Sequence, residues 1–365
     1  MILLNPGPVT LSARVRRALA AEDLCHREPE FTELQAAVRS RLLAVYGVDV
    51  ATWAAVILGG SGTLAVEAML ASLVPSVGRL LVLENGVYGE RMSEIARRHG
   101  IAVTPLHFEA GAEIQLDAVR RALTSGGGFT HVAVVHHETT TGRLNSLAPL
   151  GTLCRERGAA LLVDAVSSYG AERLDLDGWG IAACAATAHK CLHGALGISF
   201  VVVRRDAIER GAEPPRTLYL DLRTWLREQD RGGTPFTPIV PAFQALREAL
   251  DEHAEAGGWR ARGERYGALA ERIRAGLAEL GIAPWLAPEA SSVVLRSYRL
   301  PDQITYDSLH DELKKRGFVI YSGQAPLRDQ IFRVSTMGEI ADRDIDRFLA
   351  AFGEATCMPQ RKPRS

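Results

Sequence analysis

Lysine is almost missing from this chain of 365 residues. Of the 42 lysines and arginines only four are lysines. They are Lys190, Lys314, Lys315 and Lys362. Arginine keeps its proton at any ordinary pH, so it cannot act as a nucleophile or form an imine. Each remaining lysine is therefore a candidate for chemistry.

Three of the four lysines are explained by solvation. Lys314 and Lys315 lie in the charged helical stretch 311–316, and Lys362 lies in a basic tail. Lys190 differs, because it is the only lysine among the first 313 residues and sits in a segment of small residues, 185–194, between apolar runs. The alternative is that one surface lysine survived by chance.

Other absences exclude whole classes of protein. The net charge is -1, whereas a nucleic-acid binder usually has an excess of basic residues. The hydrophobic content of 47% argues against a disordered chain. No run of about 18 apolar residues could span a bilayer. Residues 1–8 lack the basic and apolar regions of a signal peptide. We therefore expect a cytoplasmic protein.

The cysteines predict neither a disulfide framework nor a metal site. There are five of them and no CxxC pair, which fits a reduced compartment and no zinc. His136 and His137 are adjacent on a predicted strand, so they point to opposite faces and are not a shared ligand pair. Cys191, beside Lys190, is interpreted as a small buried thiol rather than a reactive one. We expect no metal.

Apolar strand-like runs alternate with helical patterns through the first 200 residues, which predicts an α/β fold with a mostly parallel sheet and crossover helices. Seven strands are predicted at 53–58, 79–84, 101–106, 131–136, 159–164, 181–186 and 197–203. Helices are predicted between them at 63–74, 87–98, 117–123 and 147–157.

The second half of the chain predicts a smaller unit. Residues 213–241 are rich in Pro, Gly and Arg and are interpreted as irregular. The elements predicted after them are helices at 240–256 and 259–280, a strand at 292–296, a helix at 305–316, strands at 318–321 and 331–335, and a last helix from Ala341. We expect a large domain at 16–256 and a small C-terminal α/β domain at 257–356. Residues 1–15 would contribute to the small domain and the active site, and 357–365 would form a tail.

A glycine-rich turn suggests a phosphate cradle. Gly59-Gly-Ser-Gly-Thr63 follows one predicted strand and opens a helix, so its amide groups lie at the positive end of the helix dipole. The lysine of a P-loop and the third glycine of a dinucleotide fingerprint are both missing. Tight turns also need glycine for purely structural reasons.

An aspartate ends another predicted strand. Asp164 follows four apolar residues, at the edge where a doubly wound sheet places its ligand. Burial would raise its pKa unless a cation, such as a protonated ring nitrogen, lies beside it. The alternative is a capping aspartate for the turn 165–168. Together with the glycine turn and Lys190, it supplies what pyridoxal phosphate needs, namely a phosphate anchor, a partner for the pyridinium nitrogen and an imine-forming amine.

The same residues carry a family resemblance. From about residue 2 to residue 353 the chain resembles a class V (fold type I) aminotransferase. The motifs lie at 4–10, 60–63 with Glu67, 85–91, 137–142, 163–170, 189–194, 218–222 and 317–321. The triple threonine at 139–141 and Tyr219-Leu-Asp-Leu222 resemble the phosphonate branch of the family, whereas the alanine:glyoxylate branch carries serines and a tryptophan there.

The resemblance implies a role for each matching residue. Lys190 would be the Schiff-base lysine and proton shuttle, and Asp164 would pair with the pyridinium nitrogen. Cofactor contacts are implied for Ser61, Gly62, Thr63, Tyr88, Thr139, His189 and Thr237. Of these, Thr237 would reach the phosphate of a neighbouring subunit, which implies a homodimer with shared sites. Substrate contacts are implied for Gly7 and for Arg333, the anion-binding arginine, with Arg27 as a further candidate.

The implied activity is transfer of the amino group of 2-aminoethylphosphonate to pyruvate. Alanine:glyoxylate or serine:pyruvate transamination, or a related aminophosphonate donor, are the alternatives. A cysteine desulfurase is disfavoured, because the C-terminal region offers only Cys357. The lysine, aspartate and arginine set argues against an idle cofactor-bound interaction protein, and a nicotinamide-dependent dehydrogenase would need a G-x-G-x-x-G turn that the chain lacks.

Overall fold

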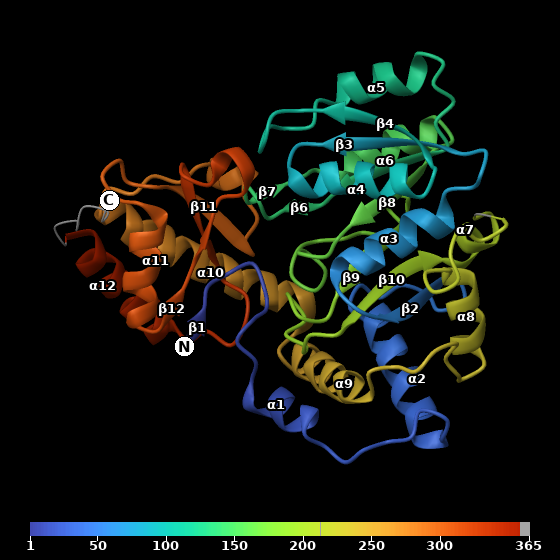
Figure 1. Ribbon diagram of the computed structural model, residues 1–365, viewed down its shortest axis with the longest axis horizontal. Helices are drawn as coiled ribbons and strands as arrows, with labels where there is room; N and C mark the ends of the chain where they lie inside the picture. Colours follow the sequence, from blue (N-terminus) through green and yellow to red (C-terminus); the bar gives the residue numbers. More distant parts are fainter. Residues whose placement is uncertain (212, 358–365) are drawn as a thin grey trace.

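A seven-stranded sheet forms the centre of the large domain in the computed structural model, which describes residues 1–211 and 213–357 (Figure 1). Strand β10 runs antiparallel to both of its neighbours, and the other pairings are parallel. In sheet order the strands are β2 (Trp53–Gly59), β10 (Ile198–Arg204), β9 (Ile181–Thr187), β8 (Ala160–Asp164), β5 (His131–Val135), β3 (Arg79–Glu84) and β4 (Ala102–His107). The predicted mostly parallel, seven-stranded sheet is confirmed.

Helices cover both faces of this sheet, which explains why its strands are apolar on both sides. One apolar core packs residues of α2 (Pro29–Ala44), α5 (Leu116–Thr124), α6 (Leu147–Glu156) and α9 (Val240–Glu255) against the strands. A second core lies on the other face and includes residues of α3 (Gly62–Leu73), α4 (Val87–Arg98), α7 (Arg205–Glu209) and α8 (Leu222–Asp230). In a sheet covered in this way, ligands bind at the carboxyl ends of the strands.

Helix α8 corrects the prediction that residues 213–241 are irregular. Asp221 caps this helix by accepting hydrogen bonds from the amides of Arg223 and Thr224. Leu222, Trp225 and Leu226 are buried on one side of it. The Pro, Gly and Arg content of the flanking residues hid an apolar spacing that is helical.

The small domain is built around an antiparallel sheet in the order β11 (Leu295–Arg299), β14 (Ile331–Ser335) and β13 (Tyr321–Ser322). Helices α10 (Gly258–Glu279), α11 (Tyr306–Lys315) and α12 (Asp342–Cys357) contribute to its apolar core. Two predicted strands were wrong in detail: the one at 292–296 begins three residues later, and the one at 318–321 divides into β12 (Phe318–Val319) and β13.

The amino terminus belongs spatially to the small domain. Strand β1 (Ile2–Leu3) pairs in parallel with β12, and Leu4 is buried in the same apolar core (Figure 1). The exact domain boundaries stay a prediction, and residues 358–365 of the predicted tail lie outside the described residues.

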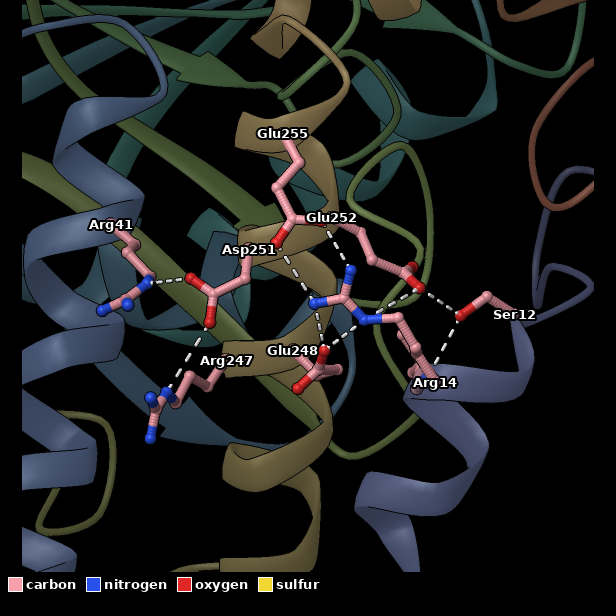
Figure 2. A network of polar contacts seen from close by, with 9 residues as sticks. Ser12, Arg14, Arg41, Arg247, Glu248, Asp251, Glu252 and Glu255 are labelled. Atoms are coloured by element: carbon pink, nitrogen blue, oxygen red, sulfur yellow. Dashed lines mark hydrogen bonds and ion pairs between the residues drawn. The ribbon is translucent and has the colours of Figure 1, made fainter.

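The chain then returns to the large domain, where an ionic network fixes α1 (Ala13–Leu19) to α9 (Figure 2). The Ser12 hydroxyl donates to Glu252 Oε1 at 2.7 Å, and the Arg14 guanidinium contacts Glu248 and Glu255, each at 2.5 Å. Arg41 of α2 binds Asp251 of α9 in the same way. The first 20 residues are thus held by both domains.

No helix within residues 1–211 and 213–357 is both long and apolar enough to cross a membrane.

Candidate active site

The three predicted chemical groups meet at the carboxyl edge of the central sheet. Asp164 is the last residue of β8, and Lys190 lies in the turn that follows the neighbouring strand β9. The glycine turn follows β2 and opens α3. This is the edge at which an open α/β sheet binds its ligand.

Lys190 is buried, with 8% of its surface exposed. Its Nζ donates a hydrogen bond to Ser167 Oγ at 2.6 Å and lies 5.9 Å from the centre of the Tyr88 ring. A Cβ atom on Gly7 would lie 3.3 Å from Lys190 Cγ, so the amino-terminal segment packs directly on this side chain. Burial lowers the pKa of Lys190 to about 8, and the nearby Asp164 carboxylate partly opposes that shift.

Asp164 faces a pocket that also contains the start of α3. The pocket is lined in part by Gly62, Thr63, Tyr88 and Arg91. One carboxylate oxygen of Asp164, Oδ1, accepts the amide of Val166 at 2.9 Å. Burial raises the pKa of Asp164, although Lys190 and Arg91 favour its charged form. A cation placed against this carboxylate would restore its charge.

The first turn of α3 has free amide groups. Ser61 is its N-cap and makes no side-chain capping bond, while its carbonyl accepts the amides of Leu64 and Ala65. The amides of Gly62 and Thr63 come before those bonds and have no carbonyl partner in the helix. Arg91 donates to the Thr63 hydroxyl at 3.3 Å, which adds positive charge to this cradle. The turn is suited to a phosphate.

Thr139 places an unused hydroxyl at the site. Its Oγ1 is buried and has no hydrogen-bond partner in the described chain. The adjacent Glu138, which sequence reasoning did not single out, accepts the amide of Tyr88 at 3.0 Å and the hydroxyl of Thr140 at 2.5 Å. Glu138 thus fixes the start of α4, where Tyr88 lies, to the threonine loop. The one clue in the sequence is a carboxylate that comes soon after the buried strand β5 (His131–Val135).

Arg333 joins the small domain to this loop. Its side chain is 1% exposed, its Nη1 donates to the carbonyl of Thr139 at 2.8 Å, and its Nε donates to the carbonyl of Ser322 at 2.7 Å. Burial lowers the pKa of Arg333 from its ordinary value. No ion pair formed within residues 1–211 and 213–357 involves Arg333, so its charge is available to a bound anion.

Of the other residues predicted from the sequence to belong to the site, one is partly buried and two are exposed. His189 contacts the Thr187 hydroxyl through Nδ1 at 2.9 Å, and burial lowers its pKa to about 4. Thr237 and Arg27 are both exposed, in the loops between α8 and α9 and between α1 and α2. Neither makes a hydrogen bond to Lys190 within the described chain, and their roles stay predictions.

The two histidines and the cysteine are neutral side chains. His136 Nδ1 contacts the Ser168 hydroxyl and His137 Nδ1 contacts the Ser167 carbonyl, and burial lowers both pKa values to about 3. Burial raises the pKa of the Cys191 thiol to about 12. No group of three or more His, Cys, Asp or Glu side chains in the described part of the chain could hold a metal ion.

The lowered pKa of Lys190 gives a testable pH dependence. We expect its amine to titrate near pH 8 in protein prepared without cofactor, whereas an unperturbed lysine titrates near 10.4. The amine is then mostly protonated at pH 7 and mostly neutral at pH 9. Carbon-13 labelling at lysine Cε gives at most four NMR signals, and Lys190→Arg identifies the shifted one by its loss. Titration of that signal above pH 10 would contradict the assignment.

These groups fit pyridoxal phosphate. The free amides of α3 match a phosphate, Asp164 matches a protonated ring nitrogen, and Lys190 supplies the amine. The unpartnered hydroxyl of Thr139 offers a donor for a further polar atom of such a ligand. Arg333 adjoins this set of groups through its hydrogen bond to the Thr139 carbonyl.

Comparison with known proteins agrees with this geometry. Residues 15–348 match the family model described as aminotransferase class-V. The chain is 38% identical to a 2-aminoethylphosphonate–pyruvate transaminase of Burkholderia ambifaria, covering 97% of this chain and 95% of that protein. It is 36% identical to a similarly named protein of Syntrophobacter fumaroxidans, with 97% and 96% covered. The crystal structure of an alanine–glyoxylate aminotransferase from Nostoc superposes with a TM-score of 0.92 at 26% identity, covering 97% of this chain and 95% of that one.

Proposed function

The chain belongs to the class V aminotransferase family, and on that premise we propose that it moves the amino group of 2-aminoethylphosphonate to pyruvate. The products are phosphonoacetaldehyde and L-alanine. Its cofactor is the pyridoxal phosphate of the family.

The donor assignment is supported by full-length similarity. Relatives named 2-aminoethylphosphonate–pyruvate transaminase are 33–38% identical to this chain over at least 96% of its length. The alanine–glyoxylate enzyme from Nostoc has a similar fold but lower identity, 26%. Alanine:glyoxylate transamination is therefore the second candidate.

Each end of the cofactor has residues that would hold it. Ser61, Gly62 and Thr63 would bind the phosphate, Asp164 the ring nitrogen and Thr139 the phenolic oxygen. Tyr88 would stack on the ring and His189 would border it. When bound, pyridoxal phosphate supplies an electron sink that stabilises negative charge on the substrate carbon next to nitrogen.

Lys190 carries the proton of the reaction. Its Nζ takes the proton from the substrate carbon next to nitrogen and later returns a proton, as general base and then general acid. In the protein without cofactor, burial already lowers the pKa of this amine to about 8, which is the direction that favours a general base near neutral pH. The Ser167 hydroxyl, 2.6 Å away, orients Nζ between these transfers.

Arg333 binds the anionic end of both substrates in turn. The donor presents a phosphonate and the acceptor a carboxylate, and the planar guanidinium can bind either one with two parallel hydrogen bonds. Its bonds to the Thr139 and Ser322 carbonyls fix the orientation of the guanidinium before a substrate arrives. Gly7 would contact the substrate beside Lys190, where a Cβ atom would lie 3.3 Å from Lys190 Cγ and crowd that side chain.

A homodimer and a cytoplasmic location complete the proposal. Thr237 lies in an exposed loop together with Ile239, which is 44% exposed, and Leu218, which is 80% exposed, lies in the same 213–241 segment. A second copy of the chain would cover these apolar side chains and receive Thr237 at its phosphate. Sedimentation equilibrium of the holoenzyme tests the dimer.

The proposed cytoplasmic location agrees with the cysteines. The free cysteines Cys25, Cys154, Cys184 and Cys191 are consistent with a reducing compartment.

A panel of amino donors tests the proposed reaction. With pyruvate as acceptor, we expect the holoenzyme to form alanine from 2-aminoethylphosphonate with kcat/KM at least tenfold above that for serine or other aminophosphonates. Alanine with glyoxylate is measured separately as glycine formation. A preference for alanine and glyoxylate would favour the second candidate, and no turnover of 2-aminoethylphosphonate would refute the donor assignment.

A further inference from the structure

Arg333 is the middle member of a row of three polar side chains across the small-domain sheet. Its direct partner on β11 is Ser297, and its direct partner on β13 is Tyr321. Side chains opposite one another in an antiparallel sheet project from the same face. Ser297 and Tyr321 therefore flank Arg333 on the face that reaches Thr139 of the large domain.

Arg333 by itself can satisfy only part of a phosphonate group. A guanidinium has five N–H donors, and here Nε and one N–H of Nη1 are used by the carbonyls of Ser322 and Thr139. The remaining donors are one on Nη1 and two on Nη2, and because Nε is occupied, only the Nη1–Nη2 edge can still offer two parallel hydrogen bonds to an anion. Such an edge binds both oxygens of a carboxylate but only two of the three oxygens of a phosphonate.

Both flanking hydroxyls are free to donate. Ser297 is 3% exposed, and its Oγ has no hydrogen-bond partner in the described chain. Tyr321 is 41% exposed, its ring centre lies 6.0 Å from Arg333 Cζ, and its hydroxyl makes no hydrogen bond within residues 1–211 and 213–357. Tyr306, by contrast, donates its hydroxyl to the carbonyl of Ile320 at 2.9 Å.

We propose that Tyr321 is a specificity-determining residue whose hydroxyl donates to the third oxygen of the substrate phosphonate beside Arg333. Ser297 supplies a second donor from the opposite side of the arginine. This inference rests on the proposed function. A planar carboxylate has no third oxygen. The three side chains therefore distinguish the amino donor, which carries a phosphonate, from the amino acceptor pyruvate, which carries a carboxylate, even though both bind at Arg333.

Two unreactive anions isolate this contact. Ethylphosphonate and propionate share an ethyl group and differ only in the phosphonate or carboxylate, so each is used as an inhibitor of alanine formation by the holoenzyme. Tyr321→Phe removes one hydroxyl, and a hydrogen bond to a charged group is typically worth a tenfold or larger change in affinity. We expect the inhibition constant of ethylphosphonate to rise about tenfold or more and that of propionate to change by less than about twofold.

Tyr306→Phe is the matched control, because it removes a tyrosine hydroxyl that is already bound to a backbone carbonyl. It should leave the ratio of the two inhibition constants unchanged. Ser297→Ala provides an independent second variant if Tyr321→Phe does not fold, and it should also weaken ethylphosphonate selectively.

The outcomes separate this inference from the proposed function. If the wild-type enzyme uses 2-aminoethylphosphonate but folded Tyr321→Phe leaves the ratio of inhibition constants unchanged, the assignment of Tyr321 is wrong. If Tyr321→Phe does not fold, an unchanged ratio for Ser297→Ala has the same consequence. Equal weakening of both anions would also overturn it, because that result indicates general damage at Arg333. If the wild-type enzyme makes no alanine from 2-aminoethylphosphonate, the proposed function itself fails.

Discussion

Lys190→Ala should reduce transamination by about 10⁴-fold or more, because general acid–base transfer alone typically contributes up to about that factor. Among residues 1–211 and 213–357, Lys190 is also the only lysine at the site that could bind the cofactor covalently. Lys314 and Lys315 lie on α11 of the small domain and cannot replace it. Alanine formation measures turnover, and the borohydride-sensitive visible band of the holoenzyme measures covalent cofactor.

Folding is expected to survive this substitution. The lowered pKa of Lys190 means that keeping its buried amine protonated at pH 7 reduces the free energy of unfolding. Removal of this amine should therefore not lower the melting temperature of the protein without cofactor. Lys315→Ala is the matched control and should retain wild-type turnover. A Lys190→Ala enzyme that kept both the visible band and the activity would refute the assignment of the lysine.

Arg333→Met should raise KM for 2-aminoethylphosphonate and for pyruvate together. Removal of one partner from a buried charge pair costs about 2 to 5 kcal/mol, which corresponds to roughly 30-fold to several-thousand-fold. Arg333 is the only one of the predicted substrate residues that is both charged and buried. Steady-state kinetics with each substrate varied in turn give both values.

Arg299→Met is a suitable control, because Arg299 is an exposed arginine at the end of β11 in the same sheet. It should leave both KM values within about twofold. A rise in only one KM for Arg333→Met would contradict the shared anion site. A fall in kcat with unchanged KM would instead point to its bond with the Thr139 carbonyl, because that bond positions the loop rather than the substrate.

The strands of the large domain could be predicted because their sequences are simple. Stretches such as Trp53–Gly59 and Ile198–Arg204 are short, apolar and bounded by turn residues, and helices bury both of their faces. Lys190, Asp164 and the glycine turn could be found for a related reason: each lies at the end of such a strand or within a few residues after it, and parallel strands bring their ends to one edge.

Other parts of the site depend on contacts that local patterns do not contain. The hydrogen bond between Glu138 and the amide of Tyr88 joins residues 50 positions apart, and no local sequence pattern around either residue predicts it. The row of Ser297, Arg333 and Tyr321 exists only in the register of β11, β14 and β13, and the sequence pattern placed the first of these strands three residues too early. Helix α8 was hidden by its flanking prolines and glycines.

The first residues of the chain form a tether between the two domains. Leu3 is held by the small-domain strand β12, and Gly7 packs on Lys190 four residues later, a span of at most about 14 Å of extended chain. Any displacement of the small domain, which carries Arg333, would therefore also move the chain that packs against the Lys190 side chain.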